Sequence, residues 1–270
     1  MAEPFIVMCA PNGARKTKDD HPALPIGAQA LADCASAIVE EGASIIHAHV
    51  RDDDGGHSLD VDRYRDAIAA IRATVGDRLI IQVTTEACGV YSSAEQMAMV
   101  RELKPEAVSI ALREFNPDQD PDAAAFYSWL SAAGIFAQHI LYSPDEVARF
   151  RALRESGVIL ESNPFVLFVL GRYTSDQQGD ISALPDFVAA AGEDTVWAVC
   201  SFGNTEHDAA ALAAANGGHI RVGFENNLLL PDGSMAEGNE ALVRVAASLA
   251  GDRPIATASD VRERFGMPAP

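Results

Sequence analysis

Eight short apolar segments, separated by helix-like sequence, constrain the fold of this chain more than any other feature. They are nearly continuous in apolar character and lie at residues 5–10, 44–50, 79–84, 107–112, 136–141, 165–170, 196–200 and 219–224. Segments of this kind are typical of parallel strands that are covered on both faces. Periodicity alone does not distinguish them from buried helix, so their regular spacing carries the strand assignment.

The intervening sequence has the signals of helices. Ser92 and Glu95 are spaced as a capping box, and apolar side chains recur at helical spacing between residues 60 and 75. Eight strand–helix units therefore predict a (β/α)8 TIM barrel, formed by residues 1–270 as a single domain. An open doubly wound sheet is disfavoured because the sequence has no Gly-x-Gly-x-x-Gly fingerprint. We expect a short extra helix at about 257–265, beneath the barrel or against another subunit.

Composition excludes several classes of function. Hydrophobic residues make up 48% of the chain and charged residues 22%, as in a globular protein with a substantial core. The net charge of −19 argues against binding to nucleic acid or to anionic lipid. The sequence contains neither a secretion signal nor an apolar stretch of membrane-spanning length. The four cysteines are far apart, which favours reduced thiols and a cytoplasmic protein.

Histidines and a glutamate at two predicted strand ends indicate a metal site. His47 and His49 end the second apolar segment, and Glu225 follows the eighth. Residues two apart on a strand point to the same face, and the carboxyl ends of barrel strands meet at one rim. Two imidazoles and one carboxylate suit Zn²⁺ with an open fourth position, although Fe²⁺, Mn²⁺ or Co²⁺ is an alternative. Ordinary hydrogen-bonded histidines are the other interpretation of the pair.

Further polar residues are predicted at the same rim. Arg221 lies four residues before Glu225 and is expected to point in the same direction, either as a clamp for a substrate carboxylate or as the partner of an interior acid. Hydroxyl and amide groups that would orient a substrate, or instead hydrogen-bond the backbone, occur at Thr84, Thr85, Ser109 and Gln138.

Six motifs carry a resemblance to a known family. They are Ala-Pro-Asn-Gly-Ala at 10–14, His-Pro-Ala-Leu-Pro at 21–25, Glu-Gly-Ala-Ser-Ile-Ile-His-Ala-His-Val-Arg at 41–51, Phe-Val-Leu-Gly at 168–171, Trp-Ala-Val at 197–199 and Gly-Gly-His-Ile-Arg-Val-Gly-Phe-Glu at 217–225. Together they resemble the β-keto acid cleavage enzyme family, over essentially the whole chain.

The resemblance implies both an activity and a set of roles. Family members are TIM barrels, usually tetramers, that condense a β-keto acid with acetyl-CoA and release acetoacetate and an acyl-CoA. The implied zinc ligands are His47, His49 and Glu225. The family pattern further implies that Arg221 assists at the reacting centre and that Thr84 and Ser109 bind the substrate.

Several positions depart from the family pattern. Asn226 stands where the family has an aspartate that partners the arginine in proton transfer, and asparagine is not a general base. Arg15 and Gln138 replace acids, Glu86 and Ala87 replace a glycine pair, and residues 172–175 replace a glycine-rich stretch.

These departures shape the functional prediction. The predicted catalytic set is Arg221, Asn226 and Glu86, with Glu86 the carboxylate best placed to act as a base. Asn12 and Arg15 join the predicted substrate contacts, and the more positive pocket favours an anionic substrate such as a dicarboxylate β-keto acid. The alternatives are a metal-dependent aldolase or hydrolase that works without CoA, and a catalytically silent barrel that binds metal and carboxylate.

Overall fold

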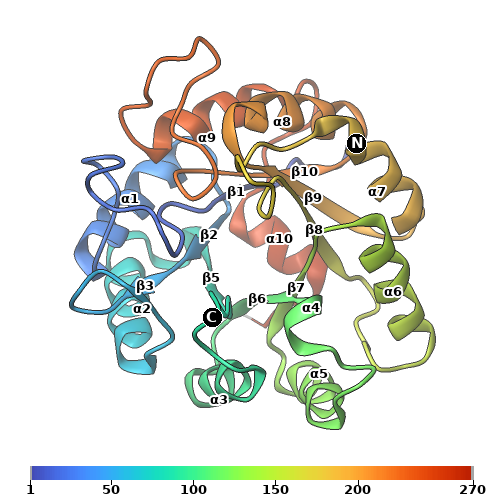
Figure 1. Ribbon diagram of the computed structural model, residues 1–270. Helices are drawn as coiled ribbons and strands as arrows, with labels where there is room; N and C mark the ends of the chain where they lie inside the picture. Colours follow the sequence, from blue (N-terminus) through green and yellow to red (C-terminus); the bar gives the residue numbers. More distant parts are fainter. Residues whose placement is uncertain (1, 269–270) are drawn as a thin grey trace.

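A closed barrel of eight parallel strands forms the centre of the molecule (Figure 1). The computed structural model describes residues 2–268. Around the barrel each strand pairs with the next, and the last pairs with the first, in the order β1 (Val7–Cys9), β2 (Ile45–Ala48), β5 (Ile80–Thr84), β6 (Ala107–Ala111), β7 (Phe136–Leu141), β8 (Phe165–Leu170), β9 (Val196–Ser201) and β10 (His219–Val222). The predicted TIM barrel is confirmed.

Helices surround the strands as an outer ring (Figure 1). They are α1 (Ala28–Glu40), α2 (Val61–Val75), α3 (Ser93–Leu103), α4 (Leu112–Phe115), α5 (Pro121–Ala133), α6 (Pro144–Glu155), α7 (Leu184–Ala191), α8 (Glu206–Ala215) and α9 (Asn239–Ser248), with short 3-10 turns at η1 (Gly76–Arg78), η2 (Ile181–Ala183) and η3 (Gly203–Thr205). The predicted capping box is present, because Ser92 and Glu95 exchange hydrogen bonds at the start of α3. Within residues 2–268, none of the helices has the length and apolar character needed to cross a membrane.

The second predicted strand is wrong at its end. It was expected to run from 44 to 50, but β2 stops at Ala48, and β3 (Val50–Arg51) pairs antiparallel with β4 (His57–Ser58). His49 therefore lies between two strands. The side chain of Asn12 takes the place of a neighbouring strand there, because its amide donates to the His49 carbonyl over 2.9 Å and accepts from the His49 amide over 3.3 Å.

The eighth predicted strand also ends early. It was expected to reach residue 224, but β10 stops at Val222 and a turn begins at Gly223. Gly223 has a φ of 133°, and a Cβ at this position would lie 2.5 Å from the carbonyl oxygen of Ala10. Only glycine fits such a conformation at such close range. Glu225 is consequently presented from a turn rather than from a strand.

The last helix closes the amino-terminal end of the barrel. Helix α10 (Ala258–Phe265) begins at a capping box formed by Thr257 and Asp260, close to the predicted bounds, and crosses behind the barrel interior in Figure 1. Val261 packs in the cluster that fills the barrel, and the Phe265 ring lies 5.1 Å from that of Phe165. Of the two predicted positions for this helix, the one beneath the barrel is observed.

We predict that Arg262→Ala destabilises the protein by about 1–3 kcal/mol, because the substitution removes one of the two arginines that pair with the largely buried Glu106 and leaves only Arg72. The Arg262 guanidinium donates to Glu106 and to the carbonyls of Asp77 and Leu79, which fastens α10 to the barrel. Chemical denaturation measures the change. Arg65→Ala removes an exposed arginine paired with Asp62 and is the control. Equal stability of the two variants would contradict this role for Arg262.

Candidate metal centre and its pocket

Three side chains meet at the carboxyl end of the barrel. The Nε2 atoms of His47 and His49 lie 3.1 Å apart, and the Oε2 atom of Glu225 lies 3.7 Å from the first and 3.4 Å from the second. Both histidines are 1% exposed. The structure thus brings together the three residues that the sequence predicts as metal ligands, with one ligand atom of each within 4.8 Å of the others.

Two glutamines set the orientation of the His47 ring. Its Nδ1 faces Gln82 Oε1 at 2.8 Å, Gln82 donates to Gln138 Oε1 over 3.2 Å, and Gln138 donates to the Met8 sulfur. Because each amide in this row donates in the same direction, Gln82 presents an oxygen to His47, so Nδ1 carries the proton. The lone pair of His47 Nε2 is therefore directed into the site, as a metal ligand requires.

Glu225 has an oxygen that the described residues leave without a donor. Its Oε1 accepts from Arg221 Nη2 over 3.1 Å, whereas Oε2 is buried and has no hydrogen-bond partner. Burial opposes ionisation of Glu225, but Arg221 and His49 hold the pKa of this carboxyl well below its usual range. Burial and the nearby Arg221 also lower the pKa of His47 to about 3. An anionic oxygen without a donor beside a neutral imidazole lone pair fits a divalent cation.

Arg221 is held rigidly beside this triad. It is 2% exposed, and its Nη2 also donates to Cys200 Sγ and to Asn226 Oδ1. The amide nitrogen of Asn226 faces Glu206 Oε1 at 3.4 Å, so a carboxylate lies one side chain further out than in the family pattern. Burial raises the pKa of Glu206 to about 8, although Asn227, Gly223 and Asn226 donate to it.

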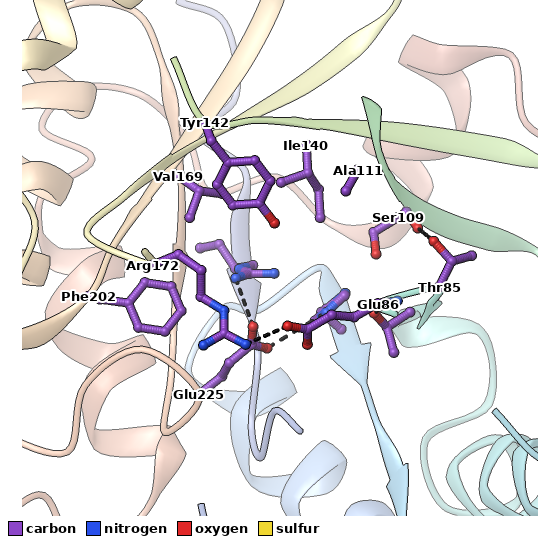
Figure 2. A pocket seen from close by; sticks show the side chains of 13 residues that line it. Thr85, Glu86, Ser109, Ala111, Ile140, Tyr142, Val169, Arg172, Phe202 and Glu225 are labelled. Carbon is purple, nitrogen blue, oxygen red and sulfur yellow. Dashed lines mark hydrogen bonds and ion pairs between the residues drawn. The ribbon is translucent and has the colours of Figure 1, made fainter. Parts of the chain in front are cut away.

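One small pocket, here called the inner pocket, lies above the triad (Figure 2). Its cavity volume is about 20 Å³, which is space for roughly one water molecule. One side is polar and is formed by His47, Thr84, Thr85, Glu86, Ser109, Arg172, Arg221 and Glu225. The other side is mostly apolar and is formed by Ala111, Ile140, Tyr142, Val169 and Phe202.

Some of the predicted substrate contacts line this pocket and others do not. Thr84, Thr85 and Ser109 do, and the Ser109 hydroxyl faces the cavity in Figure 2. Asn12 and Gln138 are at most 1% exposed, and their amides hydrogen-bond other groups of the protein. In the structure they therefore hold the site residues in place. Substrate contact by either stays a prediction.

Outside the inner pocket lies a second hollow, the outer cleft, with a volume of about 240 Å³. Arg15, which is exposed, and Lys16 contribute to it, and it shares Arg172, Phe202 and Glu225 with the inner pocket. Arg172, Phe202 and Glu225 therefore form the wall between the two spaces.

Sequence reasoning missed the most prominent contact at the mouth of the inner pocket. Arg172, from the connection after β8, forms an ion pair with Glu86, from the connection after β5. Both positions depart from the family pattern, which was a signal that neither would keep its family role. The pairing itself joins residues 86 positions apart, and only the closed barrel brings their connections together.

Comparison with known proteins gives matches along the whole barrel. A family model described as beta-keto acid cleavage enzyme matches residues 4–267. The 3-keto-5-aminohexanoate cleavage enzyme of Fusobacterium nucleatum is 31% identical over 276 residues, which cover 99% of each chain. The 3-oxoadipate:acetyl-CoA acetyltransferase of Cupriavidus necator is 28% identical over 283 residues, which cover 100% of this chain and 97% of the relative.

A solved structure extends the likeness to the fold. The complex of ObcA with oxaloacetate superposes with a TM-score of 0.72 at 16% identity, covering 92% of this chain and 68% of that one. At this identity the similarity establishes the shared barrel alone.

We predict that the purified chain binds one Zn²⁺ per molecule and that Gln82→Met weakens binding by roughly 10- to 100-fold, because the His47 tautomer is no longer fixed. Competition with a chromophoric chelator measures the affinity. Gln138→Met is the matched control and should have a smaller effect, since Gln138 acts only through Gln82. Unchanged affinity in Gln82→Met, or stoichiometric binding that survives His49→Ala, would contradict the assignment.

Proposed function

Because the chain belongs to the β-keto acid cleavage enzyme family, we propose that it condenses a β-keto acid with acetyl-CoA and releases acetoacetate and an acyl-CoA. In this reaction the carboxymethyl group of the keto acid leaves its acyl carbon and joins the acetyl group, while CoA takes up the remaining acyl fragment. One observation carries the proposal: the ligand atoms of His47, His49 and Glu225 converge beside a buried arginine, at the base of a pocket.

We assign Zn²⁺ to the triad. When bound there, the ion would act as a Lewis acid toward the keto oxygen of the substrate. Arg221 supplies a fixed positive charge near the reacting atoms, since its guanidinium is already oriented by Glu225, Asn226 and Cys200. Such pre-oriented charge stabilises negative charge that develops during a reaction.

The hydroxyls of the polar side are proposed to orient the substrate. Ser109 Oγ faces the cavity, whereas Thr84 and Thr85 already have partners, because Thr84 Oγ1 accepts from the Glu86 amide and Thr85 Oγ1 donates to the Ser109 carbonyl. Thr85 has therefore used its donor, whereas Ser109 and Thr84 each keep a hydroxyl proton that can be donated to the substrate.

Glu86 is the proposed proton acceptor in place of the missing aspartate. Burial works against its charge, but His49 and Arg172 lower the pKa of Glu86, so the paired carboxylate is a weak base. Separation from Arg172 would remove one of these two effects and make Glu86 more basic. Asn226 then has the role of orienting Arg221 rather than of moving a proton.

The relative from Fusobacterium nucleatum is named for an amino-substituted keto acid, and the relative from Cupriavidus necator is named for a dicarboxylate. The residues of this chain favour the dicarboxylate. The inner pocket has two arginines, Arg172 and Arg221, and its opposite side offers Ala111, Ile140 and Val169 to a methylene chain. We therefore propose a β-keto acid with a second carboxylate, similar in form to 3-oxoadipate.

The outer cleft is the proposed approach of acetyl-CoA. In its lining the cations Arg15, Lys16 and Arg172 outnumber the acids Asp20 and Glu225, in a chain whose net charge is −19, and this local excess suits an anionic co-substrate. Its shared wall with the inner pocket would let a thioester reach the triad. We also propose a homotetramer, as the family resemblance implies, which light scattering of the purified protein would check.

We predict that the zinc-loaded protein and acetyl-CoA convert 3-oxoadipate into acetoacetate and succinyl-CoA, identified by mass spectrometry. The kcat/KM for 3-oxoadipate should exceed the kcat/KM for neutral or amino-substituted β-keto acids by at least about tenfold, because only the dicarboxylate pairs with both arginines. Arg221→Ala and His49→Ala should each lower turnover by at least about 100-fold. Arg244→Ala, an exposed arginine paired with Glu41, is the control.

Three results would count against this function. Cleavage without acetyl-CoA would indicate an aldolase or hydrolase, and no turnover of any β-keto acid would indicate a silent binding barrel. Equal turnover of neutral and dicarboxylate substrates would contradict the proposed substrate class alone.

We further predict that Arg15→Gln raises the KM for acetyl-CoA severalfold and leaves the KM for the keto acid unchanged, because Arg15 lines the outer cleft and not the inner pocket. Steady-state kinetics with each substrate varied in turn measures both constants. Lys18→Gln, an exposed cation on the same connection, is the matched control. A rise in the KM of the keto acid instead would place the two substrates the other way round.

A further inference from the structure

Each arginine of the inner pocket is neutralised by a carboxylate of the chain itself. Arg221 pairs with Glu225, and Arg172 pairs with Glu86. The first pair contains Glu225, whose carboxylate is a proposed metal ligand. The second pair contains no proposed metal ligand. Figure 2 shows its two side chains meeting from opposite sides of the pocket, beside Glu225.

The Arg172–Glu86 pair lines an inner pocket that is too small to hold a keto acid. The cavity holds about 20 Å³, whereas pockets for small organic ligands are typically about 300–1,000 Å³. Both partners line this cavity, and Arg172 also lines the outer cleft. A substrate that enters from the outer cleft therefore has to separate the pair.

The two partners are not equally free to move. The Arg172 side chain is 8% exposed, and its guanidinium carbon lies 5.4 Å from the centre of the Phe202 ring. Its backbone follows Gly171, whose φ is 82° and where a Cβ would come within 2.5 Å of the backbone of Gln178 and Gly179. The connection after β8 is therefore folded tightly onto itself, and it holds Arg172 in place independently of Glu86.

The backbone of Glu86 is held by Thr84 and His57, which hydrogen-bond its amide and its carbonyl, but its side chain is less restricted. Its side chain is 14% exposed, and it begins a connection in which Val90 is 70% exposed. Within residues 2–268 its only ion pair is the one with Arg172. A carboxylate at the edge of the mouth regains hydration when it separates from Arg172 and still lines the pocket, whereas a stacked, buried guanidinium does not.

We propose that Arg172 is the residue that selects the second carboxylate of the substrate, and that Glu86 is the carboxylate of the chain that this group displaces. The inference rests on the proposed function and names the side chain behind its substrate class. A dianionic keto acid exchanges one carboxylate for another on Arg172, which stays paired. A keto acid with a neutral chain opens the pocket and leaves Arg172 without an anion, so the pair excludes it.

Equilibrium binding tests the exchange without any turnover. Isothermal titration of the zinc-loaded protein, in the absence of acetyl-CoA, compares 3-oxoadipate with the monocarboxylate 3-oxohexanoate, which has the same number of carbons. Arg172→Met should weaken 3-oxoadipate binding by at least about tenfold, as expected for the loss of a charge-assisted pair, and should strengthen 3-oxohexanoate binding, because the pair that excludes a neutral chain is gone. Glu86→Gln should tighten 3-oxoadipate binding, because the competing carboxylate is gone.

The opposite signs of the two variants distinguish exchange from a purely structural pair. If the pair only maintains the fold, both variants weaken both ligands. Arg172→Lys keeps the positive charge but lacks the two-pronged guanidinium. Its affinity for 3-oxoadipate should lie between that of Arg172→Met and that of the wild type. Arg149→Met, which removes an arginine that pairs with Asp118 and lines neither the inner pocket nor the outer cleft, is the matched control, and thermal melting verifies that each variant is folded.

The inference is overturned if the wild type binds both ligands equally or binds neither, if Arg172→Met weakens both to the same extent, or if Glu86→Gln weakens 3-oxoadipate. Failure of acetyl-CoA-dependent cleavage would refute the proposed function and leave this binding result unaffected. Conversely, if the protein cleaves β-keto acids but Arg172→Met binds 3-oxoadipate as tightly as the wild type does, only the proposed exchange is refuted.

Discussion

The buried carboxylate of Glu225 is the interaction on which the rest of the site depends. One oxygen orients Arg221, and the other faces the two histidines with no donor of its own. Such an oxygen is unfavourable in the interior unless a cation pairs with it. The Gly223 turn and the early end of β10 keep it there, because they carry the glutamate past the strand and into the barrel mouth.

Buried amide side chains orient the two histidines that face Glu225. The row of glutamines from Gln138 through Gln82 fixes which nitrogen of His47 faces the site, and the Asn12 amide holds the backbone of His49 where β2 ends. On the open side, Arg172, Phe202 and Glu225 separate the inner pocket from the outer cleft, and Arg172 pairs with Glu86 inside the pocket.

Periodic features of the chain were predictable from the sequence, and contacts between connections were not. The strands β7 and β8 lie within the predicted bounds, since turn and helix-start signals bound them, with Ser143 and Pro144 after β7 and with Pro164 and Gly171 on either side of β8. The His47, His49 and Glu225 cluster was predictable because parallel strands end at one rim. The hairpin of β3 and β4 was missed because it has only four residues in its strands, and the partner of Arg172 was missed because nothing local links residue 172 to residue 86.

The coordination of the bound ion tests this account most directly. X-ray absorption at the zinc edge of the metal-loaded protein should give only nitrogen and oxygen ligands at about 2.0–2.2 Å, with outer-shell scattering from two imidazoles. The same measurement on His49→Ala should lose part of the imidazole signal. A sulfur ligand, or a spectrum without imidazole that is unchanged in the variant, would contradict the assignment of the metal to His47, His49 and Glu225.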